Sequence, residues 1–347
     1  MQKNIDTSNL KFDDIYSLIK PENFKKDNPL TRNYTLQYGL GNCLKKYCGF
    51  KEDYKIKAFF EHGIVFSNHL EGPIRIHESL PSVVSSSFRK EIIENQKHNN
   101  GVYAIGPYIA YVDSLLSKEE TENEKKRLGK NLLIFPAHSV KESKQNYDVE
   151  NFCEKIKEIS TDYDSVRVCL YWKDVTNGYG ELYKQYGVEV VTAGYINDPL
   201  FLNRLRSIIE CSTVTMSNKI GTHVGFTLYL KKPHYIINIK TESQEAIDTT
   251  INKMVNKAKF KLQKRIKENN NDKDIKQIEQ LLTCKAPNEK ELSKLLNKYF
   301  GFNEVKSKEQ LKDIMLSCEN QYSPIKFYLK IVVLLKNYMV SLLKTFI

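Results

Sequence analysis

The sequence predicts an α/β protein whose strands form parallel sheets. The first observation is the stretch from residue 130 to residue 240, where apolar, β-branched runs alternate regularly with segments of helical periodicity. Such runs are typical of strands that helices cover on both faces of a sheet. The second is composition, since 41% hydrophobic and 27% charged residues are ordinary for a folded protein with a sizeable core. The length of 347 residues favours two domains.

The N-terminal half predicts a less regular set of strands and helices. About fifty residues mix short helical patterns with aromatic residues, and residues 56–68 then form an apolar strand pattern with a polar interruption. Residues 80–96 predict a strand followed by a helix, for which three serines beginning at Ser85 are candidate caps. Residues 101–112 are another apolar run. The highly charged segment 117–130 suits a solvated helix or a linker, and we place the domain boundary there.

The C-terminal half contains the regular part of the pattern. Strands are predicted at 131–139, 165–172, 188–194, 213–218 and 233–239. Helices are predicted at 146–160, 178–187, 198–212 and 221–232. Asn146 or Asp148 would cap the first of these helices, and Pro199 would lie near the first turn of the third, where proline is favoured. The alternation predicts a Rossmann-like half, and further helical segments follow to about residue 320.

Charge, cysteine content and hydropathy indicate the class of partner and the cellular compartment. The formal net charge of +11 predicts an acidic partner: nucleic acid, an anionic membrane face or a phosphate-bearing substrate. The seven cysteines are scattered and odd in number, which favours reduced thiols in the cytosol over a disulfide framework. We find no signal-peptide pattern at the N-terminus and no uncharged apolar run of the roughly 18 residues that span a bilayer. We therefore expect a cytoplasmic protein.

Polar residues cluster where four of the predicted strands end. The richest of these ends is the stretch SNKIGTHVG, which begins at Ser217 and leads into a predicted helix. Parallel sheets bind ligands at the carboxyl ends of their strands, and the N–H groups of helix N-termini there favour phosphates. We therefore expect a nucleotide-sized crevice, with simple helix capping as the alternative for this stretch. The candidate binding residues are His138, Ser139, Trp172, Gly194, Tyr195, Ser217, Asn218, Gly221, Thr222, His223 and Gly225.

No standard nucleotide motif accompanies these strand ends. The first turn lacks G-x-G-x-x-G, so a standard NAD site is not expected, and there is no phosphate-binding G-x-x-x-x-G-K-[ST] loop. No Asp-x-Asp lies in a loop suited to Mg²⁺ or Mn²⁺. We therefore expect no metal ion and no other cofactor, because helix N-termini together with Lys and His can carry the charge of a diphosphate.

Two stretches give the chain a family resemblance: FPAHS, which starts at Phe135, and GYINDPLFLNRLRSIIECSTVTMSNKIGTHVGFTLYLKKP, which starts at Gly194. They resemble the donor-binding half of GT-B glycosyltransferases that build bacterial capsules and lipopolysaccharide, such as sialyl- and Kdo-type transferases, and more distantly the CDP-glycerol glycerophosphotransferases. The resemblance implies two Rossmann-like domains facing a cleft. Residues 1–125 would bind the acceptor, residues 126–245 would bind the nucleotide-sugar, and residues 246–347 would form a helical, basic extension.

The resemblance also implies that the N-terminal half supplies the catalytic base. An inverting transferase needs a general base within hydrogen-bond reach of the acceptor hydroxyl. The sialyltransferase-like pattern has an acidic pair before a glycine, whereas this chain has Glu61, His62 and Gly63. The base is therefore either Glu61 or His62, and a simple strand-ending turn is the alternative. His138 is the nearest equivalent of the family's phosphate-gripping His-Pro pair, a departure that leaves a CMP-linked donor open.

The C-terminal segment from Pro324 predicts an amphipathic helix. Lys326, Lys330 and Lys344 share a narrow polar face, and most of the other side chains are apolar. With the basic stretch 253–267, this segment suits attachment to the anionic inner face of the cell membrane. A terminal helix packed on the fold is the alternative. No nucleic-acid recognition module is visible, so nucleic acid is not an expected partner.

These observations lead to one expected function and three alternatives. We expect a metal-independent glycosyltransferase that moves a sugar from a nucleotide-activated donor to a glycan or lipid-linked glycan of a bacterial capsule or lipopolysaccharide. The alternatives are a phosphotransferase with a CDP-linked polyol donor, a sugar-nucleotide 2-epimerase, and a non-catalytic membrane-bound partner in polysaccharide assembly. The sequence sets neither the sugar, the linkage, the stereochemical course nor the oligomeric state.

Overall fold

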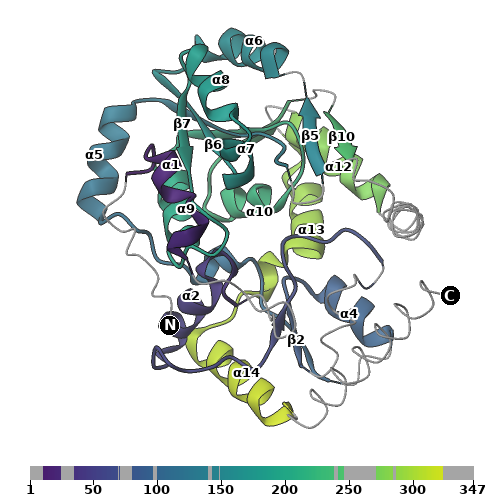
Figure 1. Ribbon diagram of the computed structural model, residues 1–347. Coiled ribbons are helices and arrows are strands. Elements are labelled where there is room, and N and C mark those ends of the chain that lie inside the picture. Colours follow the sequence, from purple (N-terminus) through teal and green to yellow (C-terminus); the bar gives the residue numbers. More distant parts are fainter. Residues whose placement is uncertain are drawn as a thin grey trace, which may run out of the picture.

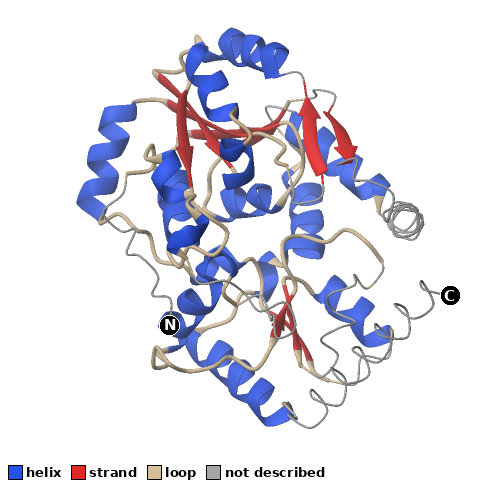
Figure 2. Ribbon diagram, in the orientation of Figure 1, coloured by secondary structure: helices blue, strands red, loops and turns tan. Residues whose placement is uncertain are grey.

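The α/β prediction is confirmed by the computed structural model. The structure describes residues 11–24, 35–68, 70, 80–96, 100–139, 143–147, 149–237, 241–245, 271–283 and 287–322, with the backbone alone for 143–147 and 241–245. The strands in these ranges form a five-stranded, a three-stranded and a two-stranded sheet, and the first two are parallel throughout. The five-stranded sheet lies in the upper part of Figures 1 and 2, with the three-stranded sheet below it.

In the larger sheet all strands are parallel, and the order in which the chain adds them reverses at the centre of the sheet. Its strands are β4 (Asn131–Phe135), β6 (Ser165–Leu170), β7 (Glu189–Thr192), β8 (Val214–Ser217) and β9 (His234–Ile236). Their spatial order is β7-β6-β4-β8-β9. The chain therefore builds outward from β4 to β7, then crosses back and builds outward from β8 to β9. In open sheets of this kind the point of reversal, here between β4 and β8, is where ligands bind.

Helices cover both faces of the larger sheet. They are α5 (Lys118–Leu128), α6 (Val149–Ser160), α7 (Trp172–Thr176), α8 (Tyr179–Gln185), α9 (Phe201–Glu210) and α10 (Thr222–Tyr229). Side chains of the central strand β4 alternate between the two faces, as a strand period of two requires. Leu132 and Ile134 pack in one cluster with α6 and α8, while Leu133 and Phe135 pack in another with α9 and α10.

Local sequence explains where several of these helices begin and which face they bury. In α6 the buried side chains recur at helical spacing: Val149, Phe152, Cys153 and Ile156. At the start of α5, the Ser117 side chain accepts a hydrogen bond from the Glu120 N–H, and the Glu120 carboxylate accepts one from the Ser117 N–H. This reciprocal capping box makes the charged segment a helix rather than a linker.

The smaller sheet is short and is followed by a capped helix. Its strands are β1 (Phe59–Phe60), β2 (Ser82–Val84) and β3 (Val102–Ala104), and the helix after β2 is α4 (Ser87–Asn95). The Ser86 hydroxyl accepts a hydrogen bond from the Arg89 N–H at 3.4 Å, which confirms the predicted serine cap. The strand predicted over residues 56–68 spans only the two residues Phe59 and Phe60 in the structure, although the Glu61 N–H still donates to the Val83 carbonyl of β2.

The remaining elements join the two sheets. They are α1 (Ile15–Leu18), α2 (Leu40–Cys48), α12 (Asp272–Thr283), α13 (Glu289–Phe300), α14 (Lys308–Gln321) and the 3₁₀ turns Pro21–Asn23, Gln37–Gly39, Tyr108–Tyr111 and Phe302–Glu304. One hydrophobic cluster contains Phe60 and Val83 from the smaller sheet, Leu133 from the larger sheet, and residues of α2, α9 and α14. Helix α13 packs against α4 and against α12 (Figure 1), and α12 packs against β9. The core is therefore continuous between the two sheets.

Three local predictions are wrong. Residues 143–147 form strand β5, paired antiparallel with β10 (Thr241–Glu245), whereas the sequence predicted a helix that begins at residue 146. Asn146 lies within this strand, so it cannot cap α6, and Asp148 lies outside the described residues. Pro199 precedes the N-cap Leu200 of α9 and is not in its first turn. The strand pairing joins segments almost a hundred residues apart, which local periodicity does not reveal.

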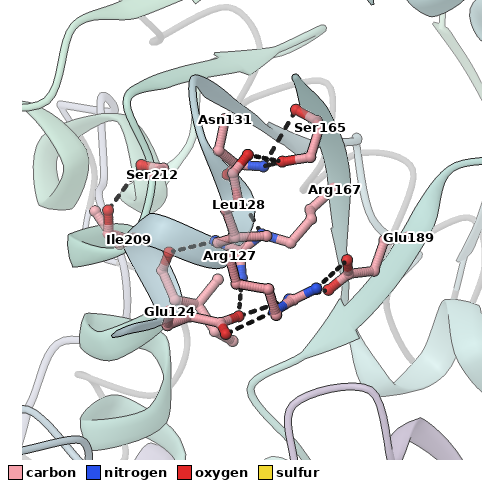
Figure 3. Close-up of polar contacts among 10 residues, drawn as sticks. Glu124, Arg127, Leu128, Asn131, Ser165, Arg167, Glu189, Ile209 and Ser212 are labelled. Carbon is pink, nitrogen blue, oxygen red and sulfur yellow. Dashed lines mark hydrogen bonds and ion pairs between the residues drawn. The ribbon is translucent and has the colours of Figure 1, made fainter. Parts of the chain in front are cut away.

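Polar residues at the amino ends of the larger sheet's strands bind one another in a network (Figure 3). Arg127 forms ion pairs with Glu124 at 2.7 Å and Glu189 at 3.1 Å. The buried Arg167 donates from Nε to the Asn131 Oδ1 at 3.3 Å, and its Nη1 lies 3.6 Å from Glu124. These groups bind one another, so they hold the strand starts together.

The membrane-related predictions concern segments that the structure leaves undescribed. In the described ranges, no helix combines the length and the apolar character needed to cross a bilayer. The basic stretch 253–267 and the segment from Pro324 onward both lie outside those ranges. Attachment to an anionic membrane surface therefore stays a prediction.

Candidate active site at the carboxyl edge of the larger sheet

The loops that follow β4 and β8 meet at the point where the strand order reverses. The Ala137 N–H, in the loop after β4, donates a hydrogen bond to the Asn218 Oδ1, after β8, at 2.7 Å. These loops are the FPAHS and SNKIGTHVG stretches of the sequence. Because β4 and β8 are adjacent parallel strands, their carboxyl ends share one edge, and the hydrogen bond fixes the two loops relative to each other.

The SNKIGTHVG loop presents hydrogen-bond donors at the start of α10. Gly221 is the N-cap of this helix, and no side chain caps it. Asn218 is only 6% exposed. Because its Oδ1 accepts from the Ala137 N–H, its Nδ2 points away from Ala137. Among the described residues, this Nδ2 has no hydrogen-bond partner. An uncapped helix N-terminus beside a buried, unsatisfied amide donor favours an anion.

Ser217 points into the protein instead of toward this site. Its hydroxyl donates to the Lys219 carbonyl at 3.0 Å and lies 3.0 Å from the Nε2 of His234. His234 is 4% exposed, and its Nδ1 contacts the Thr215 hydroxyl at 2.8 Å. Burial holds the pKa of His234 well below its usual range, so the imidazole is neutral. Ser217 therefore stabilises the loop through internal hydrogen bonds.

The loop after β1 docks on the first residue of α10. The Ile64 N–H donates a hydrogen bond to the Thr222 hydroxyl at 3.0 Å. Gly63, with φ of +73°, allows this approach, since a Cβ there would lie 3.1 Å from the Thr222 Oγ1. This contact brings the candidate base His62, from the smaller sheet, to the same place as the strand ends of the larger sheet.

His138 influences the pKa values of two other histidines, His62 and His223, across this contact. His62 and His138 are exposed and His223 is half-buried, yet the surrounding protein lowers all three pKa values. Burial, with a contribution from His138, lowers the pKa of His62 to about 4 and that of His223 to about 3. Exposure combined with poor hydration is expected where side chains line a concave surface that water still reaches. At pH 7 the three imidazoles are neutral.

Glu61 and His62 have different environments. Glu61 is 5% exposed, and its carboxylate binds the buried Arg89 through both oxygens, with the Nη2 to Oε1 distance at 2.6 Å. The neighbouring His62 side chain lies on the surface, where its Nε2 is 2.9 Å from the Tyr38 hydroxyl. Of the two candidate bases, His62 is therefore the one that a substrate can reach.

Two tyrosines that the sequence did not single out link the histidines. The Tyr38 ring stacks on His62 with centroids 4.5 Å apart, and its hydroxyl lies 3.5 Å from that of Tyr171. The Tyr171 ring in turn lies 4.7 Å from His138. Tyr38 has a φ of 58°, which is rare for a residue with a side chain. Tyr171 directly precedes Trp172 at a predicted strand end, and this position was the one signal in the sequence that could have identified it as a site residue.

The strand ends of β6 and β7 contribute buried and aromatic groups. Ser139 is 1% exposed, and its N–H donates to both carboxylate oxygens of Asp174, at 3.1 and 3.2 Å. Tyr195 stacks on Phe24 and meets Trp172 edge-on, with centroids 5.6 and 4.9 Å apart. Trp172 and Tyr195 are both half-buried, so part of this aromatic surface is accessible.

The three candidate glycines serve the backbone. Gly194 has a φ of +105°, and a Cβ there would lie 2.9 Å from the buried Arg204. Gly221 has an extended conformation and begins α10, with the His223 ring against it. At Gly225 a Cβ would lie 2.0 Å from a ring carbon of Phe300, so this glycine lets α10 pack closely on α13. Gly225 therefore faces away from any ligand at the loop.

A metal site is not evident in the described part of the chain. Within it, no group of three or more His, Cys, Asp or Glu side chains lies close enough to hold a metal ion. The histidines at the site have aromatic and backbone neighbours: Tyr38 for His62, Tyr171 for His138 and Phe135 for His223. Metal independence stays a prediction.

Comparison with known proteins gives a limited result. No protein-family model matches the chain, and no curated protein matches its sequence. Among solved structures, the chain is similar to the crystal structure of the pneumococcal O-GlcNAc transferase GtfA in complex with UDP and GlcNAc, with a TM-score of 0.32 and 10% sequence identity. The similarity covers 82% of this chain and 52% of that chain, so this chain spans about half the length of the GtfA chain. We therefore base the function on the residues of the site.

Proposed function

We propose that this protein is a glycosyltransferase with a nucleotide-activated sugar donor, and that its active site lies where the loop after β1 meets the start of α10. The observation that carries the proposal is the 3.0 Å hydrogen bond from the Ile64 N–H to the Thr222 hydroxyl. It joins a loop with an accessible imidazole, that of His62, to an anion-favouring site at Asn218 and α10. Transfer requires both, a base for the acceptor hydroxyl and stabilisation of the leaving phosphate.

The proposed reaction assigns a role to each side of this contact. The His62 imidazole takes the proton of an acceptor hydroxyl while that oxygen attacks the anomeric carbon of the donor sugar. The bond from this carbon to the nucleotide's phosphate oxygen breaks, and negative charge grows on the leaving phosphate. The amide of Asn218 and the first N–H groups of α10 stabilise that charge, and His138 lies beside them.

The acceptor and the cellular setting are further parts of the proposal. The FPAHS and SNKIGTHVG stretches resemble those of transferases that build capsules and lipopolysaccharide, and this resemblance supports a glycan or lipid-linked glycan of such a polymer as acceptor. The net charge of +11 supports a location at an anionic membrane surface. The half-buried rings of Trp172 and Tyr195 suit the base or ribose of the donor. We propose that the reaction runs without a metal ion, so activity should be unchanged by EDTA.

Nucleotide binding is the direct test. The thermal unfolding midpoint of the purified chain would be measured with CMP, CDP, UDP, GDP, TDP and a pyridine dinucleotide. A ligand that binds only the folded state stabilises it by about 2.7 kcal/mol at a hundred times its dissociation constant. We expect one nucleotide to raise the midpoint and the dinucleotide to leave it unchanged. No response to any nucleotide would overturn the donor site.

Matched variants place the ligand at the proposed edge. His138→Gln and Asn218→Ala should weaken the nucleotide response, because both residues belong to the loops after β4 and β8. Glu189→Gln changes a polar group at the opposite edge of the same sheet and should leave the response unchanged. An equal loss in all three variants would mean that the ligand does not bind at the carboxyl edge.

A further inference from the structure

The loop that carries His138 is held from both neighbouring strands. In the sheet, β4 lies between β6 and β8, and the loop after each neighbour supplies an acceptor for the backbone of residues 137–139. Asn218 accepts from the Ala137 N–H at 2.7 Å, and Asp174 accepts from the Ser139 N–H at 3.1 and 3.2 Å. His138 is the exposed residue between these two fixed amides.

The buried carboxylate of Asp174 is an unusual acceptor for a backbone hydrogen bond that only holds a loop. It is 2% exposed, and in the described part of the chain it forms no ion pair. Burial raises its pKa to about 6, against the opposing effect of hydrogen bonds from the Ser139 hydroxyl and N–H. A buried carboxylate without an ion pair lowers folding stability. An asparagine would accept the same backbone hydrogen bond without the charge, so stability alone does not account for the acid.

We propose that Asp174 is a positioning residue for the candidate active site: its ionised carboxylate, bound to Ser139, fixes the 137–139 loop so that His138 faces the ligand. A hydrogen bond to an ionised acceptor is stronger than one to a neutral acceptor, so the ionised acid fixes the loop better than an amide does. The consequence for catalysis rests on the proposed function, whereas the state of the loop does not depend on it.

The contact is linked to protonation of the acid. Near pH 6 the carboxylate gains a proton and the charge assistance to the Ser139 N–H is lost, so the loop is held less firmly below this pH than at pH 8. Other groups around the loop also bear on its pH response. Those that face Asp174 are Lys173, Tyr171 and Tyr179, and those that face His138 are Lys219, His62 and His223.

The direct test follows the Ser139 amide by ¹H–¹⁵N NMR from pH 4.5 to 8. We expect its chemical shift to titrate near pH 6 in the full chain and in His138→Gln, where the neighbouring imidazole is absent. The titration should vanish in Asp174→Asn. The matched control is Asp164→Asn, because Asp164 accepts from the Lys130 N–H at 2.7 Å in the same way, at the opposite edge of the sheet. This control should leave the Ser139 titration unchanged.

Stability and ligand binding separate positioning from a structural role. Because the folded-state pKa of Asp174, about 6, lies above the usual aspartate value of about 3.8, ionisation lowers stability as pH rises from about 4 to about 6. Asp174→Asn should therefore raise the urea midpoint at pH 8. The same variant should weaken nucleotide binding about twofold to threefold, and Asp174→Ala about tenfold, the scale of one lost charge-assisted hydrogen bond.

Three outcomes decide the proposal. A Ser139 titration that is absent in the full chain, or that persists in Asp174→Asn, overturns it. Lower stability of Asp174→Asn at pH 8 also overturns it, since the acid would then serve the fold alone. If no nucleotide binds, the proposed function fails, while the Ser139 titration still supports or overturns the contact between Asp174 and the loop.

Discussion

At the residue scale, the carboxyl edge combines polar groups whose partners lie within the protein with a buried amide nitrogen that has none in the described part of the chain and with two exposed imidazoles. Ser217 and Ser139 have internal partners, His234 and Asp174. The amide nitrogen of Asn218 has none among the described residues, and His62 and His138 are exposed. Buried polar groups are normally hydrogen-bonded, so an unsatisfied one beside accessible imidazoles marks this edge as the place for a ligand.

The histidines predict a link between nucleotide binding and protons. In the ligand-free protein the pKa of His62 is about 4, and that of His138 lies below its usual 6.5. An anion placed beside them raises both values, so the complex binds more protons than the free protein. In Asp174→Asn, where the acid no longer titrates and cannot weaken binding near pH 6, affinity should therefore increase as pH falls from 7 to 5. Calorimetry in two buffers of different ionisation enthalpy should show proton uptake on binding.

The control for this prediction removes the titrating groups. In the double variant His62→Gln with His138→Gln, proton uptake should fall while weak binding remains. Uptake of the same size in that variant would show that the protons come from elsewhere. Equal heats in the two buffers for the unaltered chain would contradict the link itself.

Glu61 predicts a stability effect that is separate from catalysis. Glu61→Gln leaves the fully buried guanidinium of Arg89 without its counter-charge. Breaking a buried ion pair in this way costs about 3–5 kcal/mol of folding free energy. Urea unfolding should show this loss, while Glu94→Gln, in an exposed pair on the same helix, should change little. A stable Glu61→Gln protein with lost activity would instead make Glu61 the base.

At the scale of elements, α10 connects the candidate site to the helices that close the molecule. Its first residue, Thr222, binds the loop after β1. One turn further along, Gly225 lies against Phe300 at the end of α13. The helix is therefore held at both its ligand-facing end and its packing face, which gives the N–H groups at its start a fixed direction. Such preorganised donors are effective at stabilising a developing charge.

Gly225→Ala is the test of this packing. The added Cβ would lie 2.0 Å from the Phe300 Cδ1, so α10 or α13 has to move. Overpacking of this kind costs about 1–3 kcal/mol. Urea unfolding should show that loss, and the second change Phe300→Leu should recover part of it by making room. A Gly225→Ala protein of unchanged stability that fails to bind nucleotide would restore Gly225 as a ligand-contacting residue.

At the scale of the whole molecule, the two parallel sheets share one hydrophobic cluster. Phe60 and Val83 of the smaller sheet and Leu133 and Val191 of the larger sheet belong to it, together with Met315 of α14. Two sheets joined by a continuous core lose buried apolar surface together when either one opens. We therefore expect the described parts of the chain to unfold as one cooperative unit, although chains of this length often do not.

A single tryptophan makes this expectation measurable. Trp172 follows a strand of the larger sheet, so its fluorescence reports on that sheet, while far-UV circular dichroism reports on all helices and strands. Val83→Ala, in the smaller sheet, removes two methyl groups from a fully buried site and should cost about 1–3 kcal/mol. Both urea midpoints should fall together. A fluorescence midpoint that stays in place would mean that the sheets unfold independently.

The sequence by itself determined the elements of the larger sheet and the edge at which to look for a site. The five strands and most of their helices follow from hydrophobic periodicity, and the serine cap at Ser86 follows from local hydrogen bonding, both of which depend on near neighbours in the chain. The rule that parallel strands place their carboxyl ends together also predicted that the loops carrying His138 and Asn218 share one edge, and the structure joins these loops through the hydrogen bond from the Ala137 N–H to Asn218.

Only the tertiary structure decided which polar residues remain available for a ligand. Ser217, Ser139 and Glu61 are as polar as Asn218 and His62, but their partners come from distant parts of the chain or from another loop. Tyr38, the pairing of β5 with β10, and the core shared by the two sheets also depend on contacts between remote segments. Local periodicity carries no record of such contacts, because they form only when the whole chain packs.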